Sequence, residues 1–176
     1  MEIQIIVPYG SNKNLGATYN RLMQDVSDWV CFLDHDILNV NPNWYKICTA
    51  AIETIGHDAG WITGVTNRIA CPFQICYDAP KDDDIMAHMA YAKNRYSRHQ
   101  ANAHLIDKDN MLLELSGFMI LTHKEAWEAT GGFCDGFLGV DNDYHRKILA
   151  AGYNTYVLPG LYMYHIYGAK NEWDNF

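Results

Sequence analysis

The chain has 176 residues, 49% of them hydrophobic, and carries 13 basic against 21 acidic side chains, a formal net charge of −8. This length and composition predict one folded domain over residues 1–176, and the negative charge argues against a nucleic-acid partner. We expect no signal peptide and no integral membrane segment, because there is no basic, apolar leader and no apolar run of membrane-spanning length. The five cysteines have neither zinc-site nor redox spacing, which favours a reduced, cytoplasmic location.

The first third of the chain alternates strand-like and helix-like segments. Three short apolar runs are typical of buried strands: residues 3–7, 29–33 and 60–65. Two amphipathic segments between them are typical of helices: residues 14–26, with Asn14 as N-cap, and residues 41–56, with Pro42 at the start and Gly56 at the end. This order predicts a parallel sheet with covering helices. The run at 29–33 is apolar on both faces, so we expect it to be a central strand.

The remainder of the chain is less regular. The aspartates at 82–84 are expected to open a polar helix with Ile85, Met89, Ala92 and Tyr96 on one side. Further strands are expected at 112–121, 154–158 and 161–165, and a helix is expected after 136–143 that Gly152 ends. Thr122 with Glu125 has the spacing of a capping box for another short helix, which would end at residues 131–132.

Two aspartates stand at the end of the second apolar run. Asp34 and Asp36 are two residues apart, so in a continued strand they would share one face. The carboxyl ends of the strands are where open parallel sheets bind ligands. Paired carboxylates are hard oxygen ligands that suit Mg²⁺ or Mn²⁺ and leave room for substrate phosphates. The alternative interpretation is an Asp-rich turn after a strand.

Four stretches together resemble the glycosyltransferases of the GT-A fold, most closely the family 2 type. They are residues 32–36 (Phe-Leu-Asp-His-Asp), 116–118 followed by 131–133 (Ser-Gly-Phe and Gly-Gly-Phe), 139–143 with Arg146 and Gly152 (Gly-Val-Asp-Asn-Asp), and 164–168 (Tyr-His-Ile-Tyr-Gly). The resemblance implies an α/β, Rossmann-like GT-A fold: a mostly parallel central sheet with helices on both faces and one antiparallel strand from the later half. Two features depart from the family. The nucleotide-binding half is shortened at its N-terminus, and Val140 stands where the family has Glu.

The resemblance also implies a function. Such an enzyme moves a sugar from a nucleotide-diphosphate sugar, with UDP as the expected nucleotide, to a hydroxyl group of a saccharide or other acceptor, with inversion. Asp36 and His165 would ligate Mn²⁺ (or Mg²⁺), and Asp34 would contact the ribose or the metal. Asp141 would be the general base that takes the proton of the acceptor hydroxyl. The donor would be bound by Pro8, Tyr9, Asn14, Arg21, Asp34, Ser116 and Gly117.

Other interpretations remain open at this point. Asp141 also suits a helix cap, His165 a satisfied histidine on a half-buried strand, and Arg21 a surface position. A haloacid-dehalogenase-type phosphatase also begins with an apolar strand that ends in Asp-x-Asp, and a shortened relative could bind nucleotide sugars without turnover. We expect the helical insert at 81–105 to border the acceptor cleft and to be more mobile than the core.

Overall fold

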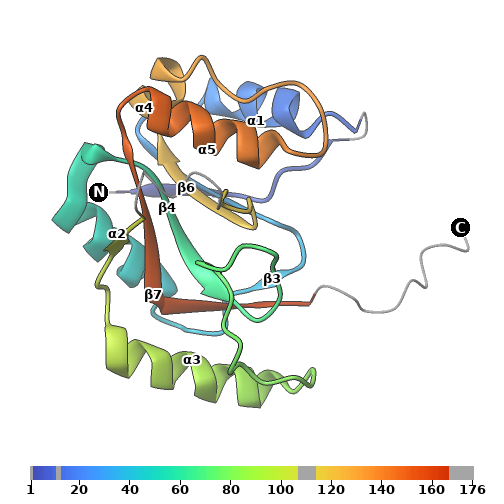
Figure 1. Cartoon of the computed structure of the whole chain (residues 1–176), viewed down its shortest axis with the longest axis vertical. Coiled ribbons are helices and arrows are strands. Elements are labelled where there is room, and N and C mark those ends of the chain that lie inside the picture. The colour runs from blue at the N-terminus through green and yellow to red at the C-terminus, as the bar shows by residue number, and fades with distance from the viewer. Residues whose placement is uncertain (1, 11–12, 107–113, 167–176) are drawn as a thin grey trace, which may run out of the picture.

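The computed structural model describes residues 2–10, 13–106 and 114–166 (Figure 1). In chain order the elements are β1 (Ile3–Ile6), α1 (Leu15–Met23), β2 (Trp29–Leu33), β3 (Ile37–Leu38), α2 (Trp44–Ile55), the 3-10 helix η1 (Gly56–Asp58), β4 (Ala59–Thr66), α3 (Ile85–His99), β5 (His104–Leu105), β6 (Met119–His123), α4 (Lys124–Ala129), α5 (Val140–Ala150) and β7 (Asn154–His165). Within these described residues, every helix is too short or too polar to cross a bilayer.

The seven strands form one mixed sheet in the order β1-β2-β6-β4-β7-β3, with β5 paired to β7 beside this path. The expectation of a mostly parallel sheet is therefore wrong. β1 and β2 are parallel, as are β4 and β7, but the other four pairings are antiparallel. β6 accounts for two of these four pairings, because it enters the sheet at the edge where β2 ends and runs back between β2 and β4. β1, β2, β4 and β7 still point the same way, so their carboxyl ends share one edge.

Strand β2 is an interior strand, as its composition predicted. All five of its residues are buried. Val30 and Phe32 pack into one hydrophobic cluster, whereas Trp29, Cys31 and Leu33 pack into a second one. Because successive side chains of a strand point to opposite faces, these two clusters are the two core layers of the sheet.

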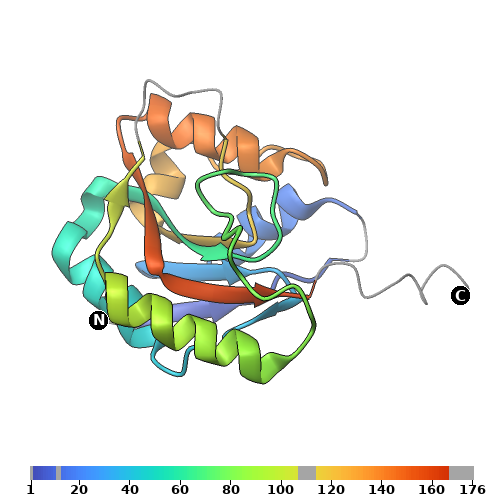
Figure 2. The same ribbon diagram turned by 60° about the horizontal axis from the view of Figure 1, so that its bottom comes forward.

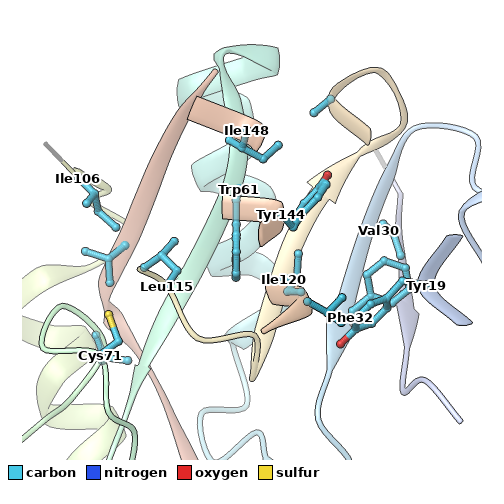
Figure 3. Close-up of a cluster of buried hydrophobic side chains, with 14 of the residues drawn as sticks. Tyr19, Val30, Phe32, Trp61, Cys71, Ile106, Leu115, Ile120, Tyr144 and Ile148 are labelled. Atoms are coloured by element: carbon cyan, nitrogen blue, oxygen red, sulfur yellow. The ribbon is translucent and has the colours of Figure 1, made fainter. Parts of the chain in front are cut away.

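Helices cover both core layers. α1, α4 and α5 lie over the first layer, where Tyr19, Trp61 and Tyr144 are among the fully or almost fully buried side chains (Figure 3). The indole Nε1 of Trp61 donates to the carbonyl of Met119 at 2.9 Å, so this buried donor is satisfied. α2 covers the second layer with Ile47, Cys48, Ala51 and Ile52. α3 lies along the later half of β7 (Figures 1 and 2).

The apolar side of α3 packs only in part. Ala92 is buried and Tyr96 packs against the second layer, whereas Ile85 and Met89 are 49% and 39% exposed and His88 is buried. A polar residue occupies the packed face because its ring is fully satisfied: Nδ1 of His88 pairs with the hydroxyl of Tyr162 at 2.7 Å, and Nε2 with the carbonyl of residue 82 at 2.9 Å.

The capping box expected before α4 does not form. Thr122 lies inside β6, where its hydroxyl donates to the carbonyl of Gly60 at 2.6 Å. His123 is the N-cap instead, and its Nδ1 accepts the N–H of Ala126. The buried strand extends two residues further than the pattern indicated, to His123, and Thr122 finds its partner on a neighbouring strand.

The two apolar runs at 154–158 and 161–165 form one strand, β7, that bends at its middle (Figure 1). Its register against β4 shifts between Thr63 and Val65, opposite this bend. Gly160 lies at the bend, where an added Cβ would stand 2.0 Å from the carbonyl oxygen of Gln100. The chain that follows α3 can therefore approach β7 only because residue 160 has no side chain.

This contact yields a prediction for stability. Gly160→Ala should lower the free energy of unfolding by about 3 kcal/mol, because the methyl group overlaps a backbone atom that cannot move alone. Gly152→Ala is the matched control: it has φ +90° but no atom within 4 Å of the added methyl, so it should cost only about 1–2 kcal/mol. Urea denaturation of both variants measures the difference, and equal losses would contradict the steric explanation.

Candidate functional site

The carboxyl ends of the parallel strands surround a cavity of about 680 Å³. It is lined by Val7, Pro8, Tyr9, Gly10, Lys13, Asn14, Leu15, Thr18, Leu33, Asp34, His35, Asp36, Ile69, Ser116, Gly117, Phe118, Phe137, Leu138, Gly139, Asp141 and His165. Nine of the ten residues proposed from the sequence for the site are in this set. They come from the ends of β1, β2 and β7, the N-cap of α1, the segment before β6 and the first turn of α5, so the fold brings together side chains that are far apart in the sequence.

Arg21 is the predicted residue that the structure places elsewhere. It is exposed on α1, because Tyr19 and Met23 are the residues that this helix turns toward the sheet. Arg146 also lies outside the cavity, where it pairs with Glu114 and lies 3.9 Å from Asp143. Among the described residues that line the cavity, Lys13 is the one lysine or arginine, so the cavity is predominantly acidic.

The insert around α3 does not border this cavity either. The lining set contains no residue between 81 and 105. The expectation that this segment borders the acceptor cleft is therefore not supported by the cavity, whereas its expected mobility stays a prediction.

Asp36 and His165 form a close pair of candidate metal ligands. Nε2 of His165 lies 3.2 Å from Oδ2 of Asp36. The backbone fixes this approach, because β3 pairs with β7 so that Ile37 faces His165, and the N–H of Ile166 donates to the carbonyl of Asp36 at 3.0 Å. With the carboxylate of Asp34, three ligand atoms lie within 4.8 Å of one another.

The ring of His165 presents a lone pair to this group. Its Nδ1 lies 3.0 Å from the carbonyl oxygen of Arg68, which can only accept, so Nδ1 carries a proton. In the neutral ring Nε2 is then an acceptor that faces the carboxylate of Asp36. Two acceptors at 3.2 Å need a proton or a cation between them. Adjacent ligands at ~2.1 Å from an octahedral ion lie about 3 Å apart, so the pair fits a divalent cation.

Asp34 has an unusual electrostatic environment. Burial, followed by the charges of Asp36 and Asp141, raises its pKa to about 6. Burial, followed by the charges of Asp34 and Asp141, raises the pKa of the Tyr19 hydroxyl well above its usual range. Asp34 is therefore close to two further carboxylates, and a cation in the cavity would relieve their repulsion.

Asp141 lies in the first turn of α5 and faces the cavity. Its Oδ2 accepts the N–H of Gly117 at 2.8 Å, and its Oδ1 accepts the N–H of Asn142 at 3.0 Å. A Cβ on Gly117 would stand 2.9 Å from the Cβ of Asp141. Glycine at 117 is therefore what lets the segment before β6 approach the carboxylate this closely.

Asn14 has a structural role at the cavity. Its Oδ1 accepts the N–H of Ala17 as the predicted N-cap of α1, and it also accepts the N–H of Gly136 at 3.0 Å. The N–H of Gly16 donates to the carbonyl of Gly136 at 3.2 Å. These bonds attach α1 to the turn at 136–139, which carries two exposed apolar residues into the cavity wall.

Several residues of the cavity carried no functional signal in the sequence. Phe137 and Leu138 are 59% and 87% exposed, and they lie between Gly136 and Gly139, both with positive φ. The sequence Gly-Phe-Leu-Gly at 136–139, with two large apolar residues between two glycines, is the pattern that could have predicted an exposed apolar turn here. Tyr9, which is 85% exposed and also lines the cavity, was expected at the site.

A second group of candidate metal ligands, His57, His123 and Glu125, lies at the opposite edge of the sheet. Nδ1 of His57 is 3.3 Å from Glu125, and its Nε2 is 3.1 Å from Asp28. The two imidazole rings are stacked, with centroids 4.5 Å apart and planes at 14°, so their in-plane lone pairs cannot converge on one ion. Nδ1 of His123 also accepts the N–H of Ala126, so its Nε2 carries the proton. The group at the cavity is the better metal site.

Comparison of the sequence with protein-family models and with curated proteins gives no match.

The environment of Asp34 predicts a pH dependence of stability. Because its pKa is higher in the folded state than the usual 3.8, the unfavourable ionisation of Asp34 lowers stability as the pH rises from about 4 through about 6. Without divalent ions, Asp34→Asn should therefore raise the free energy of unfolding by about 1–2 kcal/mol at pH 7, allowing for partial solvent screening. At pH 4 the gain should vanish.

Urea denaturation at both pH values measures this gain. Asp25→Asn, an exposed change outside the cavity, is the control. An equal effect of Asp34→Asn at pH 4 and pH 7 would show that Asp34 is not in the crowded, buried state described above.

Proposed function

We propose that the protein is a metal-dependent glycosyltransferase of the GT-A type, which transfers a sugar from a nucleotide-diphosphate sugar to a hydroxyl group of an acceptor. The observation that carries this proposal is a single cavity that contains both a candidate divalent-cation site (Asp34, Asp36, His165) and a further carboxylate, Asp141. The expected cation is Mn²⁺ or Mg²⁺, and histidine as a ligand favours Mn²⁺ over Ca²⁺. A UDP-sugar as donor follows from the sequence resemblance alone.

The charge of the cavity supports a role for the cation. A nucleotide diphosphate is an anion, and the cavity already contains the carboxylates of Asp34, Asp36 and Asp141, with Lys13 as the one lysine or arginine that lines it among the described residues. An anionic donor would be repelled unless a cation lay between it and these groups. When bound, the cation also supplies electrostatic stabilisation of the diphosphate leaving group.

The protein's own residues would place the two substrates. Tyr9 and Pro8 line the cavity at the end of β1, where the nucleotide base is expected, and Ser116 and Gly117 line it before β6. Asp141 would accept the proton of the acceptor hydroxyl as that oxygen attacks the anomeric carbon. The N–H groups of Gly117 and Asn142 hold its carboxylate in one orientation, so a reaction would not have to wait for its rotation.

The metal site can be tested without knowledge of the acceptor. Asp36→Ala should weaken Mn²⁺ binding at least ~100-fold, since even the loss of an outer-shell partner of a metal ligand costs about 10–100-fold. The Mn²⁺-dependent increase in melting temperature on addition of UDP or a UDP-sugar should disappear with it. The variant should stay folded, because the Asp36 side chain is partly exposed. Unchanged binding of Mn²⁺ and nucleotide by Asp36→Ala would refute the metal site.

The same assays separate the two other functions. Phosphate release from a simple phosphomonoester, with no effect of nucleotide sugars, would favour a phosphatase. Metal-dependent binding of a nucleotide sugar with neither transfer nor hydrolysis would favour a binding protein.

The role of Asp141 yields a kinetic prediction. Asp141→Asn keeps the size of the side chain but cannot accept a proton. Its single amide oxygen can keep one of the two hydrogen bonds from the backbone N–H groups of Gly117 and Asn142. The substitution should lower kcat by about 10²–10⁴-fold and leave donor affinity nearly unchanged, as expected for a group used only in the transition state. Asp143→Asn is the matched control on the same helix, because Asp143 pairs with Lys147 at 2.8 Å outside the cavity.

Transfer to a verified acceptor, or donor hydrolysis if none is found, provides the assay. Near-parental turnover by Asp141→Asn, or retention of the donor's anomeric configuration in the product, would exclude Asp141 as the base of an inverting transfer.

A further inference from the structure

Two buried side-chain amides, Asn67 and Gln74, each form a pair of hydrogen bonds with the backbone of a residue that lines the cavity. We infer that they are positioning residues: Asn67 sets the place of His165 in the metal site, and Gln74 sets the place of the Ser116–Gly117 backbone that holds Asp141. This inference rests on the proposed function. Neither residue touches the cavity itself, and neither belongs to a motif in the sequence.

Asn67 holds the main chain of His165 on both sides. Its Oδ1 accepts the N–H of His165 at 2.8 Å, and its Nδ2 donates to the carbonyl of His165 at 3.2 Å. The hydroxyl of Thr66 donates to the same Oδ1 at 3.1 Å and so fixes the orientation of the amide. The next residue, Arg68, accepts the Nδ1 proton of the His165 ring. Residues 67 and 68 therefore fix both the backbone and the ring of the candidate metal ligand.

Gln74 holds the main chain of Ser116 in the same way. Its Oε1 accepts the N–H of Ser116 at 2.8 Å, and its Nε2 donates to the carbonyl of Ser116 at 2.9 Å and to the hydroxyl of Thr63 at 3.0 Å. Gln74 is completely buried. The following N–H, that of Gly117, is the one that donates to Asp141. The direction of this N–H therefore depends on the peptide that Gln74 holds.

Both amides belong to one closed segment that follows β4. The N–H of Thr66 donates to the carbonyl of Gln74 at 2.7 Å, and the N–H of Cys76 donates to the carbonyl of Thr66 at 2.7 Å. A buried amide is costly unless all its polar atoms are paired, so these two would not be retained for packing alone. Asn67 pairs with the main chain of His165 just beyond the last β4–β7 pair, Thr66 with Met163. Gln74 pairs with the main chain of Ser116 before β6 begins, so one short segment contacts two sides of the cavity.

The structure offers a matched control that uses the same device away from the cavity. Asn20 accepts the N–H of Phe133 at 2.9 Å and donates to its carbonyl at 2.8 Å. Phe133 does not line the cavity. Asn20→Ala removes the same pair of hydrogen bonds and a third one, from Nε1 of Trp127. Asn67→Ala likewise removes a third bond, from Thr66, so Asn20→Ala reports what such a loss does to stability alone.

The first test is a titration of the protein with Mn²⁺ alone, in which calorimetry measures the Kd. Asn67→Ala should raise the Kd for Mn²⁺ about 10-fold or more, the size of effect that outer-shell partners of metal ligands have. Gln74→Ala and Asn20→Ala should leave this Kd within about twofold, although all three variants lose stability. If Asn67→Ala is too unstable, Asn67→Ser, which keeps a short polar side chain, gives the same comparison with a smaller defect.

The second test concerns Gln74. Gln74→Ala should speed amide hydrogen exchange at Ser116 and Gly117 by at least about 10-fold relative to β2, and should lower kcat for transfer or donor hydrolysis with little change in KM. Gln74→Glu, which keeps the acceptor but loses the donor to the Ser116 carbonyl, should give an intermediate value of each quantity. Asn67→Ala should change exchange at Ser116 much less.

The outcomes separate this inference from the function on which it rests. A parent protein that binds no Mn²⁺ would overturn the proposed function and the role of Asn67 together. A parent that binds Mn²⁺ through Asp36, while Asn67→Ala and Asn20→Ala bind it equally well, would overturn the positioning role alone. Unchanged amide hydrogen exchange at Ser116 and Gly117 in Gln74→Ala would overturn the positioning role of Gln74.

Discussion

The crowding of three carboxylates at one edge of the sheet is the interaction on which the site depends. Asp34, Asp36 and Asp141 line the same cavity, and the raised pKa of Asp34, about 6, reports burial and then the charges of the other two. Charges of one sign are held together only where the surrounding structure enforces it or a counter-charge compensates for it. Here the enforcement comes from backbone: N–H groups bind Asp141, and the β3–β7 pairing places Asp36 against His165.

Strand direction explains how these groups come to share one edge. β1, β2, β4 and β7 run in one direction, so their carboxyl ends bring Tyr9, Asp34 and His165 together. β6 runs in the opposite direction, so it is the start of this strand, with Ser116 and Gly117 just before it, that reaches the same edge. The mixed sheet, which departs from the expected parallel one, is therefore what completes the cavity.

The sequence predicted those parts of the fold that depend on local pattern. The apolar run at β2 and the cap at Asn14 depend on residues close in the chain, and both form as expected. Thr122 was assigned to a cap from its local spacing to Glu125. Its actual partner, the carbonyl of Gly60, is 62 residues away, and a local pattern cannot reveal such a partner. The burial of His88 on α3 was not predicted for the same reason, since its partner Tyr162 is 74 residues away. Site residues at strand ends were predictable, whereas Asn67 and Gln74 were not, because their partners are backbone atoms that carry no sequence signal.

The two interpretations of Asp141, helix cap and general base, are compatible in the folded chain. A carboxylate in the first turn of α5 is favoured by the positive end of the helix dipole, and its bond to the N–H of Asn142 is a local one that any such residue could make. The bond from Gly117 is different, since it crosses from the segment before β6 and requires glycine there. A cap needs only the first contact. The second adds nothing to the helix, but it fixes the carboxylate relative to the segment expected beneath the donor. The close approach at Gly117 is thus the feature of this site that helix stability alone does not explain.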